Sequence, residues 1–390
     1  MTALAYPVFD ADNHYYESPD AFTRHIPKKM AARCVQWAEI DGRTRLLVGG
    51  KVSNVLPNPL FDPVAKPGCL FEYFKGENPE GLDIRALFGD LEPIRPEYRS
   101  REVRLQVLDE QGVDKVLLFP TLGVVLEQHI EEDPEACVAA FHAFNEWILD
   151  DWGFDYEGRM FSAAYLTLAD ADAAVAEVEW AIAHGVKLVD VRAAPPPVSS
   201  GATSPADPIF DPVWARLEEA GVLVCTHSGS STRWFADRWE GPTQPTGFRV
   251  MPLRWMLNVN RDVTDFFAVV ISHGLFARFP RLRMMSVENG AGWVGPLKKL
   301  FKKAYGQNPT YFAENPIDTF DQHVWVTPFW EDPIDVVVAD VPGDRIAYGS
   351  DWPHAEGTQH PLDYLDTVAG LDDALRRRIV HDNVLAALGG

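Results

Sequence analysis

The first stretch with chemical potential lies at residues 8–17, where an apolar run leads into several acids and a histidine. In an extended strand the side chains alternate between two faces, so Asp10, Asp12 and His14 would point the same way. Three such groups at the end of a buried strand are unfavourable unless a cation or a water-filled site receives them. A surface turn that begins at Asp12 and is capped by His14 is the alternative. This stretch alone leaves both interpretations open.

Similar groups recur later in the chain at the ends of apolar runs, namely His227, Glu288 and Asp351. In a parallel barrel, active groups sit at the C-terminal ends of the strands, which meet at one rim. Together with Asp12 and His14, these side chains would repel one another or stay unpaired there without a divalent cation. We therefore predict that all five residues are metal ligands.

The elements that would position these residues alternate between strand-like and helical segments. Apolar runs typical of buried parallel strands are followed by segments of helical spacing, such as 101–111, which ends at Gly112. About eight such strands occur without a composition break. We predict an α/β fold, a (β/α)8 TIM barrel, as a single domain over residues 1–390. An open doubly wound sheet is the alternative, weakened because no Gly-x-Gly-x-x-Gly follows the first strand.

Two segments do not fit this alternation and are predicted to be insertions. Residues 20–100 follow the first strand and contain a hairpin-like part, Val35 to Val52, with Asp41-Gly42 at its turn. A stretch rich in proline and aromatic residues follows, and we expect the insertion to cap the barrel mouth. The alternative is that these aromatic residues pack a small core within the insertion itself. A helical insertion after the fifth strand covers about residues 232–267.

Composition restricts the classes of partner. The chain has 390 residues, 46% of them hydrophobic, which is enough for a large core. Its net charge of -22 repels phosphate backbones and anionic lipid, so we expect no nucleic-acid and no membrane partner. The N-terminus lacks a secretory pattern and the four cysteines are scattered, which predicts a cytoplasmic protein with reduced thiols. We expect a homo-oligomer that acts on a small-molecule substrate.

Several motifs resemble the amidohydrolase superfamily, most closely its amidohydrolase-2 branch. The specific ones are Glu-Asn-Gly-Ala-Gly-Trp at 288–293 and Ser-Asp-Trp-Pro-His at 350–354, and Thr-His-Ser-Gly at 226–229 is weaker. The branch includes aminocarboxymuconate-semialdehyde decarboxylase and the resorcylate and carboxyvanillate decarboxylases, and the resemblance spans nearly the whole chain. It implies that Asp12 and His14 stand where the family has the two histidines of its first strand.

By the same resemblance, His227 is the histidine ligand of the fifth strand and Asp351 the aspartate of the eighth. Asp351 would also take the proton from an attacking water, and a role as ligand alone is the alternative. Glu288 falls where relatives commonly have a histidine, which decarboxylases of this branch tend to keep. This departure, with aspartate at position 12, argues against a decarboxylase.

Oxygen ligands combined with imidazole suit Fe, Mn or Zn as a divalent metal, and three carboxylates leave one or two ions open. His354 is predicted as a second catalytic residue that orients substrate or stabilises an oxyanion, with a structural hydrogen bond as the alternative. Arg192 is a candidate substrate-binding residue for a carboxylate, with a salt bridge to a neighbouring acid as the alternative. Asn13 and Glu17 are expected to orient the ligands, whereas His273 is not expected to bind metal.

These residues predict a metal-dependent hydrolase in which a metal-bound water, its pKa lowered to about 7, attacks a carboxylic acid derivative. The substrate would be an ester, a thioester such as an acyl-CoA, or an amide, with a bulky apolar acyl group. The alternative is a non-oxidative decarboxylase of an aromatic or unsaturated acid. A metal-containing binding protein without turnover is a third interpretation, from a different class.

Overall fold

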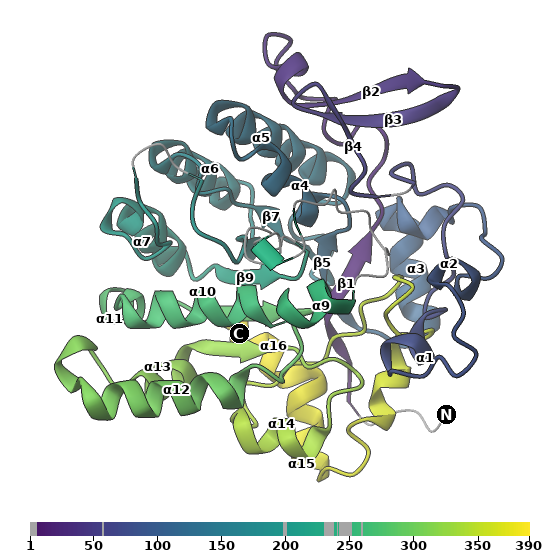
Figure 1. Ribbon diagram of the computed structural model, residues 1–390. Coiled ribbons are helices and arrows are strands. Elements are labelled where there is room, and N and C mark those ends of the chain that lie inside the picture. The colour runs from purple at the N-terminus through teal and green to yellow at the C-terminus, as the bar shows by residue number, and fades with distance from the viewer. Residues whose placement is uncertain are drawn as a thin grey trace.

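Parallel strands lie at the centre of the molecule and helices surround them (Figure 1), so the predicted α/β class is confirmed. One sheet has the strand order β1-β5-β6 and the other β11-β10-β9-β8-β7. The computed structural model describes residues 6–56, 58–197, 201–229, 238–239, 241, 252–258 and 260–390. The parallel strands are β1 (Phe9–Tyr15), β5 (Lys115–Pro120), β6 (Met160–Ser162), β7 (Ala164–Tyr165), β8 (Leu188–Asp190), β9 (Leu223–His227), β10 (Met284–Val287) and β11 (Val324–Val326).

The apolar run at residues 345–349, which leads into Ser350 and Asp351, predicts the last strand, and this segment connects the outer strands of the two parallel sheets. Ala347 N–H donates to the Val326 carbonyl of β11 (2.9 Å), and Ala11 N–H of β1 donates to the Tyr348 carbonyl (2.8 Å). The segment forms only isolated bridges, because Tyr348 N–H donates to Ile379 in the C-terminal helical region. The closed (β/α)8 barrel stays a prediction, which these contacts support.

Polar caps and glycines set the bounds of the helices. Helix α3 starts at Ser100, whose side chain accepts from Val103 N–H, and it ends at Gly112, whose φ of 73° suits glycine. The helices are α1 (Phe71–Phe74), α2 (Ile84–Leu87), α3 (Arg101–Gln111), α4 (Gly123–Ile130), α5 (Pro134–Asp151), α6 (Ala171–Ala183), α7 (Asp211–Ala220), α9 (Pro252–Asn258), α10 (Arg261–Ser272), α11 (Leu275–Arg278), α12 (Val294–Gln307), α13 (Pro316–His323), α14 (Ile334–Asp340), α15 (Asp373–Arg377) and α16 (Asn383–Ala387).

The C-terminal region differs from the single amphipathic helix that its apolar spacing predicts, with apolar positions Leu371, Leu375, Ile379, Val384 and Leu388. A π-helical segment, Arg378–Asp382, lies between α15 and α16. The carbonyl of Ile379 in this segment accepts the hydrogen bond from Tyr348 N–H (2.9 Å). A widened turn leaves backbone groups free for partners outside the helix, so this contact gives a physical reason for the interruption.

The segment between β1 and α3 contains the predicted hairpin. Strands β2 (Val35–Ile40), β3 (Arg43–Val48) and β4 (Lys51–Ser53) form an antiparallel sheet at the top of Figure 1. Asp41 and Gly42 form its turn, with positive φ values of 53° and 68°. That residues 20–100 form a capping insertion stays a prediction. Half of the residues of the helical insertion predicted at 232–267 lie outside the described residues, and the described part contains α9 and the start of α10.

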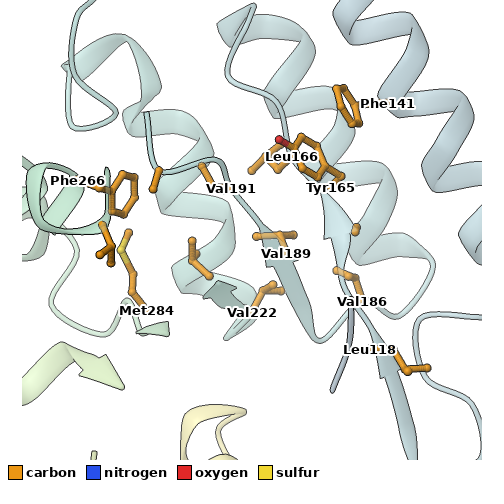
Figure 2. Packing of buried hydrophobic residues seen from close by; sticks show 14 of the residues in the cluster. Leu118, Phe141, Tyr165, Leu166, Val186, Val189, Val191, Val222, Phe266 and Met284 are labelled. Atoms are coloured by element: carbon orange, nitrogen blue, oxygen red, sulfur yellow. The ribbon is translucent and has the colours of Figure 1, made fainter. Parts of the chain in front are cut away.

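Buried apolar side chains cover both faces of the central strands, as a continuous apolar run predicts. Leu118 of β5 belongs to the cluster shown in part in Figure 2, which also includes Val189 and Met284. Its neighbours Leu117 and Phe119 belong to a second buried cluster. The alternation of strand side chains therefore places successive residues in two different apolar layers.

Strand β1 contains a bulge that changes which way its acids point. Asp10 is paired with Val116 and Asn13 with Leu118, so Ala11 and Asp12 together stand opposite one residue. The extra residue shifts the alternation, and Asp10 accepts hydrogen bonds from Ser350 N–H (2.9 Å) and the Ser350 hydroxyl (2.5 Å). The prediction that Asp10 shares a face with Asp12 and His14 is therefore wrong.

The close approach of Gly349 to Asp12 provides a test of this arrangement. A Cβ at position 349 would lie 2.7 Å from the Cβ of Asp12. We expect Gly349→Ala to displace Asp12 and to weaken metal binding roughly tenfold or more, measured as the Mn(II) dissociation constant. Gly306→Ala is the control, because a Cβ there meets nothing within 4 Å. Equal affinities in the two variants would contradict this placement of Asp12.

Candidate metal centre

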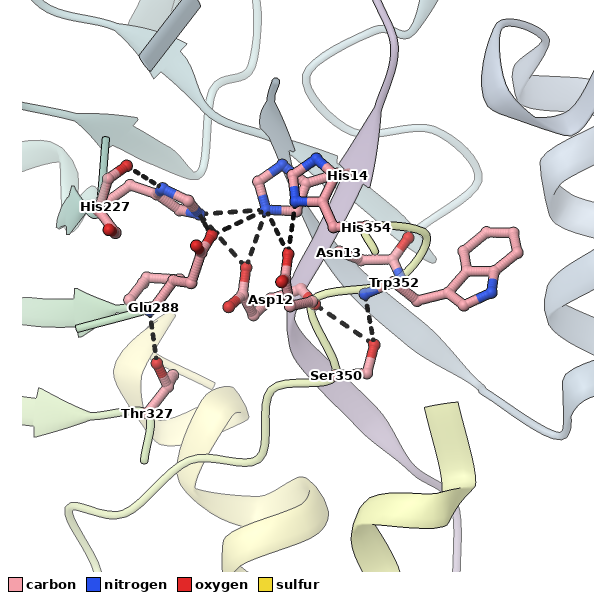
Figure 3. A network of polar contacts seen from close by, with 12 residues as sticks. Asp12, Asn13, His14, His227, Glu288, Thr327, Ser350, Trp352 and His354 are labelled. Carbon is pink, nitrogen blue, oxygen red and sulfur yellow. Dashed lines mark hydrogen bonds and ion pairs between the residues drawn. The ribbon is translucent and has the colours of Figure 1, made fainter. Parts of the chain in front are cut away.

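Four of the five predicted ligands form one donor group (Figure 3), whose atoms lie within 4.8 Å of one another: Asp12, His14, His227 and Glu288. The fifth, Asp351, belongs to a second, overlapping group with His14, Glu288 and His354. His14 Nε2 lies 3.2 Å from Asp12 Oδ1, 3.4 Å from Asp351 Oδ1 and 3.5 Å from Glu288 Oε2. His227 Nε2 lies 3.2 Å from Glu288 Oε2 and 3.4 Å from Asp12 Oδ1. These side chains come from β1, the ends of β9 and β10, and the segment that precedes residue 352.

The spacing of these atoms fits coordination of a divalent ion. For bonds of roughly 2.1 Å, the donor atoms around one ion lie about 3.0–3.4 Å apart in octahedral or tetrahedral geometry. The observed separations of 3.2–3.5 Å between nitrogen and oxygen donors agree with that expectation. The donor set of imidazoles and carboxylates therefore fits Fe, Mn or Zn.

The protonation of the two histidines strengthens this conclusion. His14 Nδ1 lies 3.2 Å from the Pro120 carbonyl, and His227 Nδ1 lies 2.6 Å from the Ser228 carbonyl. A carbonyl oxygen only accepts, so each Nδ1 carries a proton, and each Nε2 can present a lone pair to a cation once its ring is neutral. The two Nε2 atoms are 3.2 Å apart, so a cation between them would remove the repulsion of the lone pairs.

Because the ligand side chains are buried, their charges destabilise the folded protein unless a cation compensates them. Asp12 is 3% exposed, His14 0% and Asp351 8%. Glu288 and Asp351 also adopt left-handed backbone conformations, with φ values of 53° and 54°. Such a conformation costs a residue with a side chain about 1–2 kcal/mol. Strained residues cluster at functional sites, so two strained ligands at one point support a functional role for them.

The electrostatics of the protein groups by themselves show how strongly these side chains influence one another. Burial alone would lower the pKa of His14, but hydrogen bonds to Asp12 and Glu288 raise it to about 10. Burial would raise the pKa of Asp12, but hydrogen bonds from His14 and His227 hold it below its ordinary value. Burial, and then the charge of Glu288, raises the pKa of Asp351 well above its ordinary value. A proton on His14 thus replaces part of the charge of a metal.

His354 is bound between Asp351 and Thr121. The Thr121 hydroxyl donates to the Tyr15 carbonyl (2.8 Å), so it accepts from His354 Nε2–H (2.9 Å). His354 Nδ1 lies 2.6 Å from Asp351 Oδ1, a contact that requires a shared proton when no metal is bound. His354 also forms a second donor group with His14, Glu288 and Asp351. The contact with Asp351 allows His354 to hold or pass a proton there.

Several residues that support the ligands were missed by sequence reasoning. Asp190 at the end of β8 accepts from His227 N–H (3.0 Å), and Thr327 after β11 accepts from Glu288 N–H (3.0 Å). Both are polar residues at strand ends, the same signal that identified the ligands. Glu17, expected to orient a ligand, instead accepts from the N–H groups of Leu122 and Gly123 at the start of α4.

Two further sequence candidates lie apart from the ligand cluster. Arg192 follows β8, and its guanidinium is ion-paired with Glu131. A substrate-binding role for Arg192 stays a prediction, since binding of a substrate carboxylate would compete with this pair. His273 follows the last turn of α10, with Nδ1 2.9 Å from the Ser204 hydroxyl. It belongs to neither donor group among the described residues, and its exclusion from the ligands stays a prediction.

Comparison with known proteins identifies the class. The chain matches the amidohydrolase family over residues 68–389. An amidohydrolase from Mycobacterium avium subsp. paratuberculosis is 41% identical, with a TM-score of 0.94 and coverage of 99% of this chain and 100% of the other. This protein therefore belongs to the amidohydrolase family. The resemblance inferred from the motifs is confirmed.

More distant solved structures share the fold. A 5-carboxyvanillate decarboxylase from Sphingomonas paucimobilis is 14% identical, with a TM-score of 0.58 and coverage of 98% of this chain and 99% of the other. A dihydroxybenzoic acid decarboxylase from Polaromonas sp. JS666, with bound manganese and the inhibitor 2-nitroresorcinol, is 17% identical, with a TM-score of 0.56 and coverage of 82% of this chain and 93% of the other.

Within the described residues, no helix has the length and apolarity needed to cross a membrane.

The donor set predicts which substitutions remove metal. We expect Glu288→Ala and His227→Ala to lower Mn(II) affinity by roughly 100-fold or more, because even the loss of a residue behind a ligand costs 10–100-fold. Elemental analysis after dialysis measures the change. His273→Ala is the matched histidine control and should keep the metal content of the parent. Unchanged stoichiometry in Glu288→Ala would remove Glu288 from the ligands.

The raised pKa of His14 predicts a pH-dependent stability of the metal-free protein. The folded state binds this proton more tightly than the unfolded chain, whose histidine pKa is about 6.5. This stabilisation is complete below pH 6.5 and is lost as the pH rises through the folded pKa of about 10. The unfolding temperature of metal-free protein should therefore fall between pH 6.5 and 10.

The same scan on metal-loaded protein is the control for this effect. A bound ion takes the place of the proton on His14, so its unfolding temperature should change less over this range. A metal-free His14→Gln variant should likewise lose most of the slope. Parallel curves for the metal-free and metal-loaded protein would show that His14 does not couple proton and metal binding.

Proposed function

We propose that this protein is a metal-dependent hydrolase that cleaves a carboxylic acid derivative of a small molecule. The observation that carries the proposal is the charge of the donor set. Three carboxylates, Asp12, Glu288 and Asp351, outweigh the charge of one divalent ion. Such a site disfavours the close approach of an anionic substrate and suits a neutral ester, thioester or amide.

The chain's own residues supply the remaining chemistry. A bound divalent ion would lower the pKa of a water to about 7 and polarise a carbonyl oxygen. In this proposal Asp351 would accept the proton of an attacking water, and its contact with His354 (2.6 Å) would give that proton a second acceptor. The Thr121 hydroxyl holds the other nitrogen of His354 (2.9 Å), which orients the ring for this transfer.

One or two ions of Fe, Zn or Mn are the cofactor that we propose. The two overlapping donor groups share His14 and Glu288. The one available nitrogen of His14 would serve a single ion, whereas the carboxylate of Glu288 has two oxygens, so the proposal covers one ion or two. The manganese in the related decarboxylase structure supports Mn among the candidates. Arg192 is kept as a candidate for contact with an acidic part of the substrate, and assembly as a homo-oligomer is likewise a proposal.

A decarboxylase is the second candidate function. Several solved structures with this fold carry that activity in their names, including one bound to an aromatic inhibitor. In that reaction the substrate's carboxylate and a neighbouring oxygen would face the ligands, and His354 or Asp351 would protonate the carbon that loses CO2. The substrate would be an aromatic or unsaturated acid.

Two assays on one metal-loaded preparation separate these functions. We expect hydrolysis of a panel of aryl and alkyl esters, thioesters and amides, at least roughly 100-fold faster than by Asp351→Asn. Chelation should abolish this activity, and Mn(II), Fe(II) or Zn(II) should restore it. Release of CO2 from hydroxylated benzoic acids without hydrolysis would support the decarboxylase instead. Hydrolysis that persists in metal-free protein would contradict both functions.

A further inference from the structure

Arg104 of α3 is a buried cation that the proposed chemistry does not use. It is 0% exposed, and it forms no ion pair with a carboxylate among the described residues. Its guanidinium lies over the ring of Trp352 at 4.7 Å and over that of Trp152 at 5.7 Å. An unpaired charge in an apolar surrounding is costly, so its retention calls for a specific use.

All three guanidinium nitrogens are used for hydrogen bonds. Nε donates to the Glu97 carbonyl (2.8 Å), one terminal nitrogen to the Asn13 side-chain carbonyl (2.5 Å) and the other to the His14 carbonyl (2.8 Å). Arg104 therefore binds β1 at two consecutive residues, immediately after the bulge. The planar, rigid fork of arginine can hold both acceptors in one geometry, which a lysine ammonium cannot do.

Asn13 extends this contact to the segment that carries Asp351. Its amide nitrogen donates to Asp10 Oδ2 (3.0 Å), and the same carboxylate accepts from the Ser350 hydroxyl (2.5 Å) and from Ser350 N–H (2.9 Å). Arg104, Asn13, Asp10 and Ser350 form a continuous buried chain, which we call the Arg104 relay. All four residues are at most 1% exposed.

The residues of the Arg104 relay are neighbours of the ligands in the chain, and they lie on the side of β1 that faces away from the candidate metal centre. Figure 3 shows Asn13 and Trp352 on the opposite side of β1 from Asp12, His227 and Glu288. Asp12 lies between Asp10 and Asn13 in the chain, His14 follows Asn13, and Asp351 follows Ser350. The backbones are also joined directly, because Asp351 N–H donates to the Asp12 carbonyl and His14 N–H to the Trp352 carbonyl, both at 2.8 Å.

From this geometry we propose that Arg104 is a positioning residue for the metal centre. Through Asn13, Asp10 and Ser350 it fixes the bulge of β1 against residues 350–352, and so sets the separation of Asp12, His14 and Asp351. The inference concerns metal binding, so it can be tested without a substrate and independently of whether the enzyme hydrolyses or decarboxylates.

The test compares Arg104→Met with a matched arginine. Arg99 also binds backbone carbonyls near β1, those of Glu17 (2.8 Å) and Leu60 (2.7 Å), but none of its hydrogen bonds among the described residues reaches the relay. Using the full chain stripped of metal, we expect Arg104→Met to weaken Mn(II) binding roughly 10–100-fold. Arg99→Met should stay within about threefold of the parent, although both variants lower the unfolding temperature of the metal-free protein. The readouts are free Mn(II) by electron paramagnetic resonance and the spectrum of the bound ion.

Further variants keep the proposal falsifiable if Arg104→Met does not fold. Asn13→Leu removes the middle of the relay and should show the same loss of affinity, and Ser350→Ala a smaller one. Where both singles fold, Arg104→Met/Asn13→Leu should bind Mn(II) no more weakly than the weaker single variant, because the two residues act as one unit. An affinity and a bound-ion spectrum like the parent's in Arg104→Met, or in Asn13→Leu where only that variant folds, would overturn the proposal.

Discussion

The structure depends on one constraint: several carboxylates and two imidazole nitrogens lie close together in the buried candidate metal centre. Asp12, Glu288 and Asp351 face two imidazole nitrogens that are 3.2 Å apart. In a low-dielectric surrounding such an arrangement is strongly unfavourable unless a cation compensates it. Protons satisfy it in part when metal is absent, which explains why the pKa values of His14 and Asp351 move so far from their ordinary ranges.

Several irregular backbone conformations bring the candidate ligands together. The bulge in β1 turns Asp10 toward Ser350 and leaves Asp12 and His14 in the site. Glu288 and Asp351 accept left-handed backbone conformations at the points where their strands end. Each departure from regular geometry costs stability, so together they are best understood as the consequence of a donor set that function requires.

The candidate ligands could be recognised in the sequence because their signal is local. His227 and Glu288 stand at or directly after the ends of apolar runs, and parallel strands with crossovers bring such ends to the same edge. The hairpin turn at Asp41-Gly42 and the end of α3 at Gly112 are equally local, because each depends on a residue that tolerates positive φ. These features need no knowledge of distant contacts.

What could not be predicted depends on contacts between distant parts of the chain. The orientation of Asp10 is set by Ser350, which is 340 residues away in the sequence. The π-helical turn near Ile379 depends on a hydrogen bond from Tyr348. The burial of Arg104 requires Trp352 from the opposite end of the chain. No periodicity or local motif carries such information, so the relay behind the ligands is visible only in three dimensions.

The central claim, that these residues hold a divalent ion through the Nε2 atoms of His14 and His227, is open to one direct measurement. Anomalous diffraction from crystals of Mn(II)-loaded protein would locate the ion. The account predicts a peak roughly 2.0–2.3 Å from both Nε2 atoms and from oxygens of Asp12 and Glu288. A fully loaded crystal with the ion elsewhere, or coordinated through Nδ1 of either histidine, would contradict it.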